Sequence, residues 1–229
     1  MTALPAGVHR IRGFGVNAYL VAGDGEGPTL VDAGTPLDAG AVERRVERTG
    51  AALADVERVL LTHYDVDHVG GLAELARRGL DAPVYAADPD AGQVRGDKPS
   101  LANRKGLAQR LTGPLVEVPD LRVERVDDGE RVGPFDVYHT PGHTAGHVAY
   151  EHEGRSSLFV GDLVIARGGR LRVSPWPVSR DTDAVAESVV SLADRAPAAE
   201  LLAMGHGTPV AERGSVVLAR LAAAAARRT

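Results

Sequence analysis

The feature that most constrains the fold of this chain is a polar loop that directly follows an apolar run. The run is Val59-Leu60-Leu61, and the loop over residues 62–71 reads Thr-His-Tyr-Asp-Val-Asp-His-Val-Gly-Gly. Two imidazoles and two carboxylates within six residues are hard to explain as packing. Histidine and carboxylate suit zinc, iron or manganese, and three or more of them in a small space usually mean a metal. The segment therefore predicts a buried strand that ends in a metal-binding loop.

The same arrangement recurs later in the chain, where a short hydrophobic strand is followed by glycine and a ligand-type residue. Asp162 follows the apolar run that ends at Gly161, and His206 follows Leu-Leu-Ala-Met-Gly. His143 and His147 lie in the segment Thr-Pro-Gly-His-Thr-Ala-Gly-His over residues 140–147. Glycine lets the backbone pass close to a ligand, and open α/β folds place their sites at strand ends. These residues are therefore candidates for the same site.

Together these motifs resemble the metallo-β-lactamase superfamily. Its signature runs His-x-His-x-Asp-His, then a later His, an Asp after Gly, and a last His. The segment 140–147 and the Gly-Asp pair at 161–162 are most similar to the glyoxalase II and lactonase branch. The resemblance covers residues 16–209, and the motifs occur in the expected order.

The resemblance implies a dinuclear site with two divalent ions, zinc first among them. The first ion is expected on His63, His143 and Asp65, and the second on Asp67, His68 and His206, with Asp162 bridging. The implied activity is hydrolysis by a metal-bound water or hydroxide, and Asp67 is the predicted catalytic residue that accepts the proton of the attacking water. The expected metal ligands are therefore His63, Asp65, Asp67, His68, His143, Asp162 and His206. We expect His147 to orient a ligand, with a capping or surface role as the alternative, and Asp32 to lie beneath the metal loop.

Asp65 departs from the family signature, because it stands where the second histidine of the motif is expected. A third carboxylate would lower the net charge of a two-ion site and make its bound water less acidic. It would also favour harder metals, so iron and manganese are alternatives to zinc. Glutamate at this place is known in di-iron flavoproteins that resemble the family. Aspartate is shorter than histidine, so the sequence leaves open whether Asp65 reaches an ion.

Composition narrows the classes of partner. The chain of 229 residues has a net charge of −5, which argues against nucleic acid as the main partner. Arg44, Arg45 and Arg48 alternate with glutamates, and we expect them on a solvated helix face. There are no cysteines, which excludes disulfides and thiolate ligands. The amino-terminal residues lack a secretion signal and no apolar stretch approaches a membrane span, so we expect a cytoplasmic protein.

The pattern of apolar residues and breakers predicts an α/β fold, a four-layer αββα sandwich of two mixed sheets flanked by helices, in one domain over residues 1–229. Predicted strands cover 8–12, 16–22, 29–31, 58–62, 83–86, 123–126, 135–139, 148–152, 158–160 and 201–203. Predicted helices cover 36–48, 71–78, 181–195 and 214–227. The polar region 88–115 is the least regular, and we expect either a lid or a surface excursion there.

The expected substrate is a small molecule, namely an ester, lactone or thioester. Glyoxalase II enzymes carry an extra carboxyl-terminal helical region, whereas this chain ends soon after His206, so a glutathione thioester is less expected. A non-haem iron redox enzyme is the first alternative, and a non-catalytic metal-binding protein is the second. The sequence does not indicate the oligomeric state.

Overall fold

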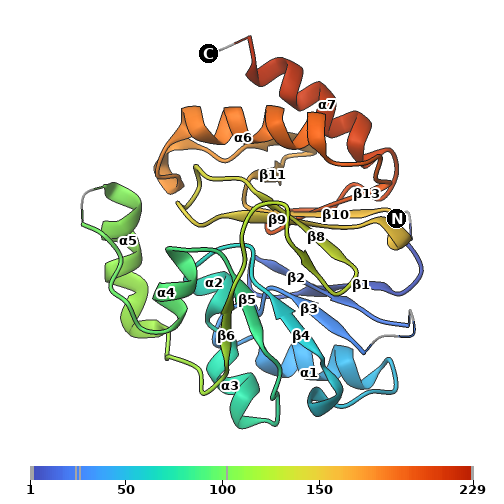
Figure 1. Ribbon diagram of the computed structural model, residues 1–229, viewed down its shortest axis with the longest axis vertical. Helices are drawn as coiled ribbons and strands as arrows, with labels where there is room; N and C mark the ends of the chain where they lie inside the picture. The colour runs from blue at the N-terminus through green and yellow to red at the C-terminus, as the bar shows by residue number, and fades with distance from the viewer. Residues whose placement is uncertain (1–2, 24, 26, 102, 228–229) are drawn as a thin grey trace.

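Two mixed β-sheets face each other, and helices cover the outer face of each sheet (Figure 1). The computed structural model describes residues 3–23, 25, 27–101 and 103–227. Helices α1 and α3 lie against one sheet, and α6 and α7 lie against the other (Figure 1). This is the four-layer αββα sandwich that the sequence predicts.

The first sheet has six strands in the order of the chain, β1 to β6. Its first three strands are antiparallel, and β3 to β6 are parallel. The strands are β1 (Val8–Arg12), β2 (Asn17–Val21), β3 (Thr29–Val31), β4 (Arg58–Leu60), β5 (Val84–Ala86) and β6 (Val123–Arg125). Because parallel strands end at the same edge, the metal loop after β4 lies at the carboxyl edge of this sheet.

The second sheet has five strands in the order β13-β10-β9-β8-β7, with β10 and β13 parallel and the other pairs antiparallel. A separate hairpin joins β11 to β12. The strands are β7 (Arg131–Val132), β8 (Phe135–His139), β9 (Val148–His152), β10 (Ser157–Gly161), β11 (Val164–Arg167), β12 (Arg170–Val173) and β13 (Leu201–Met204). The predicted strands are present, and β7, β11 and β12 are additional.

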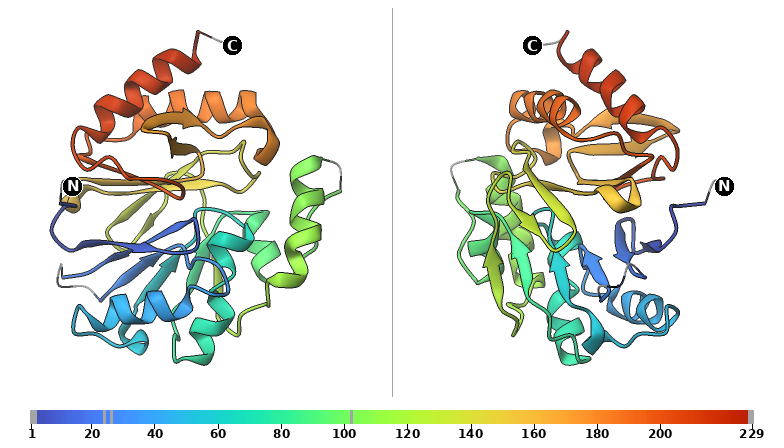
Figure 2. Two further views of the ribbon diagram at one scale, coloured as in Figure 1. Left: turned by 180° about the vertical axis from the view of Figure 1, so that it is seen from behind. Right: turned by 45° about the vertical axis from the view of Figure 1, so that its right-hand side comes forward.

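The helices differ more from the prediction than the strands do. The α-helices are α1 (Ala39–Glu47), α2 (Val66–Val69), α3 (Leu72–Arg77), α4 (Asp90–Val94), α5 (Arg104–Thr112), α6 (Thr182–Arg195) and α7 (Gly214–Ala225). Single turns of 3-10 helix occur at Leu53–Asp55, Gly113–Leu115, Glu153–Arg155 and Trp176–Val178. The region 88–115 is thus partly helical, and α4 and α5 stand side by side at one edge of the sandwich (Figure 2).

Three apolar layers hold the sandwich together, one in each space between its four layers. Leu20, Leu30 and Val42 belong to the layer between the first sheet and its helices. Tyr150 and Phe159 belong to the layer between the sheets, and α6 packs on the second sheet through a third layer. Each sheet is therefore buried on both faces, which explains why its strands read as nearly continuous apolar runs. Among the described residues, no helix is both long and apolar enough to cross a membrane.

Glu151 is an exception within β9, because its carboxylate is buried and neither oxygen has a hydrogen-bond partner among the described residues. Asp136 lies directly opposite it on β8. Burial raises the pKa of the Glu151 carboxyl to about 7, and Asp136 adds to the effect. Ionised Glu151 therefore destabilises the folded protein.

Replacing Glu151 with glutamine is expected to stabilise the protein at pH 8 by about 2 kcal/mol, since one pKa unit corresponds to about 1.4 kcal/mol. The folded pKa is above the ordinary value of 4.5, so wild type loses stability as the pH rises from 4.5 to about 7. The variant lacks this loss, and the difference should vanish below pH 4.5. Denaturant unfolding at both pH values checks this, and parallel pH profiles for the two proteins would contradict it.

Candidate metal centre

The predicted ligand residues converge where the strands of both sheets end. His63 follows β4, and the loop after β8 carries His143. Asp162 follows β10, and His206 follows β13. Backbone hydrogen bonds join the two sheets here, from Val148 N to Thr62 O at 2.8 Å and from Asn17 N to Gly205 O at 2.7 Å. The side chains therefore come from segments far apart in sequence but are held on one rigid edge.

Asp67, His68 and His206 form one group whose ligand atoms lie close together, and Asp162 adjoins it. His206 Nε2 lies 3.2 Å from Asp67 Oδ2 and 3.2 Å from Asp162 Oδ2. His68 Nε2 lies 3.5 Å from Asp162 Oδ1. A tetrahedral zinc ion with bonds of 2.0–2.2 Å separates its ligand atoms by about 3.4 Å. The spacing of this group fits a divalent ion.

The histidine rings are oriented by partners on their outer nitrogens. His68 Nδ1 bonds Asp32 Oδ2 at 2.8 Å, and His206 Nδ1 bonds the carbonyl of Gly15 at 2.8 Å. His63 Nδ1 bonds Thr62 Oγ1 at 2.9 Å. Because both carboxylate and carbonyl are acceptors, Nδ1 of His68 and of His206 carries the proton when the ring is neutral. The Nε2 atom is then left to ligate an ion.

Several buried atoms in the centre have no hydrogen-bond partner among the described residues, namely His63 Nε2, His68 Nε2 and Asp162 Oδ1. Unpartnered buried polar atoms are rare in folded proteins and call for an explanation such as an ion. All three belong to predicted ligands and lie in one cluster with ligand-forming spacing. The residues therefore fit a divalent metal ion.

Electrostatics favour a cation in the same place. Burial opposes ionisation of Asp162, but His68 and His206 outweigh it and hold the pKa of the carboxyl well below its usual range. Burial also opposes protonation of His206, but Asp162 and Asp67 raise the pKa of its ring to about 10. Burial lowers the pKa of the His63 ring to about 4, so that ring is neutral at pH 7. The carboxylates thus attract positive charge, which a metal ion can supply.

His63, His68 and Asp162 form a second group with ligand-forming spacing, and His63, Asp65 and His143 form a third. Asp65 Oδ2 lies 3.4 Å from His63 Nε2 and 3.0 Å from His143 Nε2, so the carboxylate reaches the cluster. Lys105, from α5, also enters this group and bonds both Asp65 and His143. Lys105 belongs to none of the sequence motifs that predict ligands. Its signal lies in composition, since the chain contains only two lysines, Lys98 and Lys105.

Further residues hold the ligand loops. Asp32 lies beneath the loop, as expected, and accepts from Thr62 N at 2.8 Å. The buried His147 accepts from Asp162 N through Nε2 at 3.2 Å, so it orients that residue. Asp90 was not foreseen. It accepts from Tyr64 N at 2.8 Å and from Gly146 N at 3.0 Å, and thereby ties together the loops that carry His63 and His143.

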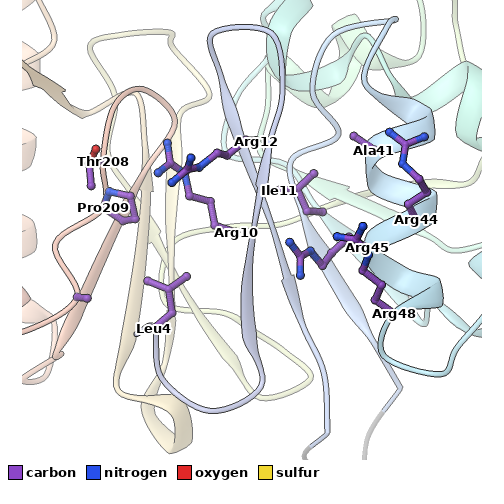
Figure 3. Close-up of a pocket in the computed structure, with 11 residues that line it drawn as sticks. Leu4, Arg10, Ile11, Arg12, Ala41, Arg44, Arg45, Arg48, Thr208 and Pro209 are labelled. Atoms are coloured by element: carbon purple, nitrogen blue, oxygen red, sulfur yellow. The ribbon is translucent and has the colours of Figure 1, made fainter. Parts of the chain in front are cut away.

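A cavity of about 770 Å³ lies beside β1 and α1 (Figure 3). Arginines dominate its lining: Arg10, Arg12, Arg44, Arg45 and Arg48. The lining holds no histidine or carboxylate and therefore no metal-ligand set. Glu43 of α1 pairs with Arg78 at 2.7 Å. The cavity is thus a separate basic surface.

Comparison with known proteins identifies the family. The metallo-beta-lactamase superfamily matches residues 11–206. The uncharacterized protein YobT of Bacillus subtilis (strain 168) is 32% identical over 203 residues, which cover 85% of this chain and 84% of YobT. The hydroxyacylglutathione hydrolase of Aeromonas salmonicida (strain A449) is 32% identical over 141 residues, 59% of this chain and 43% of that enzyme. The crystal structure of TTHA1623 in a di-iron-bound form has 31% sequence identity and a TM-score of 0.68, covering 96% of this chain and 98% of that chain.

These matches confirm the predicted family, fold and enzyme class. The match to the superfamily spans most of the chain, and its relatives include a hydrolase. The superfamily binds divalent metals, and one similar structure contains iron. The ligand-type residues cluster as such a site requires. The chain therefore belongs to the metallo-beta-lactamase superfamily and is a metallo-hydrolase.

Proposed function

We propose that the protein hydrolyses a small ester, lactone or thioester with a divalent metal ion, and that zinc is the first candidate for that ion. The observation that carries this proposal is the cluster of unpartnered buried atoms, His63 Nε2, His68 Nε2 and Asp162 Oδ1. An ion bound there would activate water near neutral pH and polarise the substrate carbonyl. The similarity to a hydroxyacylglutathione hydrolase supports acyl chemistry, although the chain spans less than half of that enzyme.

Different residues would bind the ion, orient its ligands and accept the proton. His68, His206 and Asp162 would hold the ion, and the unpartnered Nε2 atom of His63 belongs to the same cluster as His68 and Asp162. Asp32 orients His68, and His147 orients Asp162. Asp67 lies 3.2 Å from His206 through its Oδ2 atom and remains partly open to solvent. We propose that it accepts a proton from the attacking water. The net charge of −5 agrees with a small-molecule substrate rather than nucleic acid, and we propose a cytoplasmic location.

The test is a panel of esters, lactones and thioesters assayed with the zinc-loaded protein. We expect one class to be hydrolysed, with the rate lost on chelation and restored by zinc. His68→Ala should remove the activity while leaving the circular dichroism spectrum unchanged. His9→Ala, on β1 and outside the cluster, is the matched control and should retain activity. Hydrolysis that survives chelation or His68→Ala would contradict the proposal.

A non-haem iron redox enzyme is the second candidate. The carboxylate-rich cluster and the similarity to the di-iron-bound TTHA1623 favour it. Elemental mass spectrometry of protein purified without added metal separates the two candidates at the outset. Iron together with oxygen consumption, and no hydrolysis by the zinc-loaded form, would favour the redox function.

A further inference from the structure

We infer that the ammonium group of Lys105 occupies the metal position formed by His63, Asp65 and His143. The protein therefore binds one divalent ion rather than two. This inference deepens the proposed function, because it concerns the same centre and relies on that function for the role of the remaining ion. It also departs from the two ions expected from the family resemblance. The inference rests on the contacts that Lys105 makes with Asp65 and His143, two of the three residues of this group.

Helix α5 turns its polar side toward the centre. Lys105 and Gln109 are buried, whereas Leu107 and Leu111 of the same helix are 50% and 74% exposed. A surface helix normally buries its leucines and exposes its lysines. Burying an ammonium group is costly unless it is paired and hydrogen-bonded. The inverted orientation is therefore explained by the pairing of Lys105 inside the centre.

Several contacts hold α5 in this orientation. The Gln109 amide donates to the Tyr64 carbonyl at 2.5 Å and to Asp65 Oδ1 at 3.2 Å. The Arg104 guanidinium lies 4.1 Å over the Trp176 ring and donates to the Trp176 carbonyl at 2.9 Å. These contacts secure the helix on both sides of Lys105. The ammonium is thus held in place by the docked helix and not only by its own flexible chain.

The hydrogen-bonding capacity of the atoms excludes an ion from the same place. The Lys105 ammonium donates to Asp65 Oδ2 and lies 2.9 Å from His143 Nε2. An ammonium group has donors but no lone pair, so His143 Nε2 accepts when it bonds Lys105. The same nitrogen donates when it bonds Asp65 Oδ2, which lies 3.0 Å away. The lone pair of that nitrogen is then unavailable to a metal. An ion ligated by the same two atoms would lie about 2.0–2.2 Å from each, in the space that the ammonium fills.

Charge leads to the same conclusion. The ligand-type residues of the centre include three carboxylates, those of Asp65, Asp67 and Asp162. One divalent ion and one ammonium balance these three negative charges. The group of Asp67, His68 and His206 retains all its ligand-type atoms when Lys105 stays in place. The third N–H of Lys105 has no partner among the described residues and is the donor left for a substrate carbonyl oxygen.

Counting ions tests the inference without a substrate. Wild type, dialysed against zinc and measured by native mass spectrometry, should bind one ion per chain. Lys105→Met removes the charge at nearly constant volume and should raise the count to two. Lys105→Arg keeps the charge and should stay at one. The exposed Lys98→Met is the matched control for loss of a lysine and should also stay at one.

Any other count overturns the inference. Two ions in wild type would mean that a metal ion displaces the Lys105 ammonium. No ion in wild type would mean that the group of Asp67, His68 and His206 does not bind one. One ion in Lys105→Met would mean that the ammonium is not what excludes the second ion. These outcomes are independent of hydrolysis. One ion without hydrolysis would reject the proposed function alone, and two ions with hydrolysis would reject the inference alone.

If Lys105→Met does not fold, the inference can still be tested on the wild-type protein. Amine acetylation followed by peptide mass spectrometry compares the two lysines in one sample. Lys105 should react at least about tenfold more slowly than Lys98, because labelling a buried amine requires local opening. This protection should persist when zinc is added. If zinc makes Lys105 as reactive as Lys98, the ion has displaced the ammonium and the inference is wrong.

Discussion

Asp162→Ala is expected to lower kcat/KM for the best ester, lactone or thioester by at least about a thousandfold, or about 4 kcal/mol of transition-state stabilisation. Asp162 faces His68 through Oδ1 at 3.5 Å and His206 through Oδ2 at 3.2 Å. Its removal would take away one proposed ligand of the ion and leave both imidazoles without that carboxylate. The affinity for zinc should fall together with the rate. Steady-state kinetics and zinc titration of the same preparations measure the two effects.

Asp81→Ala provides the control for Asp162→Ala, since Asp81 is exposed and distant in sequence from every predicted ligand. It should leave both kcat/KM and zinc affinity unchanged. An Asp162→Ala variant that retains the wild-type rate and the wild-type zinc affinity would show that Asp162 is no ligand. Loss of rate with unchanged zinc affinity would instead assign Asp162 to the reaction step.

Asp32→Ala is expected to cause the largest loss of stability, about 3–5 kcal/mol in the free energy of unfolding. Asp32 is buried and accepts from His68 Nδ1 and Thr62 N, each at 2.8 Å, and from Thr62 Oγ1. Alanine would leave these buried donors unpartnered. Denaturant unfolding should be measured with a chelator present, because a bound ion would add its own stabilisation.

Asp32→Asn separates the structural effect from the effect on the ion. The amide oxygen can still accept from Thr62 N, so the loss of stability should be smaller, about 1–3 kcal/mol. The carboxylate that orients His68 is lost, so zinc affinity should still fall about 10- to 100-fold. Asp81→Ala should change stability by less than about 0.5 kcal/mol. Equal stabilities for Asp32→Ala and wild type would contradict the predicted role.

Much of the fold could be predicted from the sequence because each sheet is buried on both faces. Strands such as β2 and β10 therefore appear as short apolar runs that end at glycine or at polar residues. The predicted helices at α1 and α6 were recognisable because each buries one apolar stripe. Helix α5 was missed for the opposite reason. Its buried residues are polar and its leucines are exposed, so its pattern resembles that of a surface loop.

The ligand-type residues that cluster in the structure were recognisable in the sequence because each follows a strand and a glycine or lies in a dense motif. The residues that hold them were mostly not found. Asp90 is separated from Tyr64, whose backbone N–H it accepts, by 26 positions. The Ser174 hydroxyl bonds His143 Nδ1 at 2.8 Å, although Ser174 and His143 are 31 positions apart. A single buried Asp or Ser carries no periodicity or motif. Only the packing of the loops reveals which backbone or ring it bonds.

The sequence alone thus determined the layers, the edge where the site lies and the set of ligand-type residues, because strand burial and strand-end motifs are local properties. The tertiary structure decided which of these atoms meet and what lies between them. Lys105 and Asp65 are 40 positions apart, and nothing local to either residue predicts their contact. That contact depends on how α5 docks, and docking is a property of the whole packed chain.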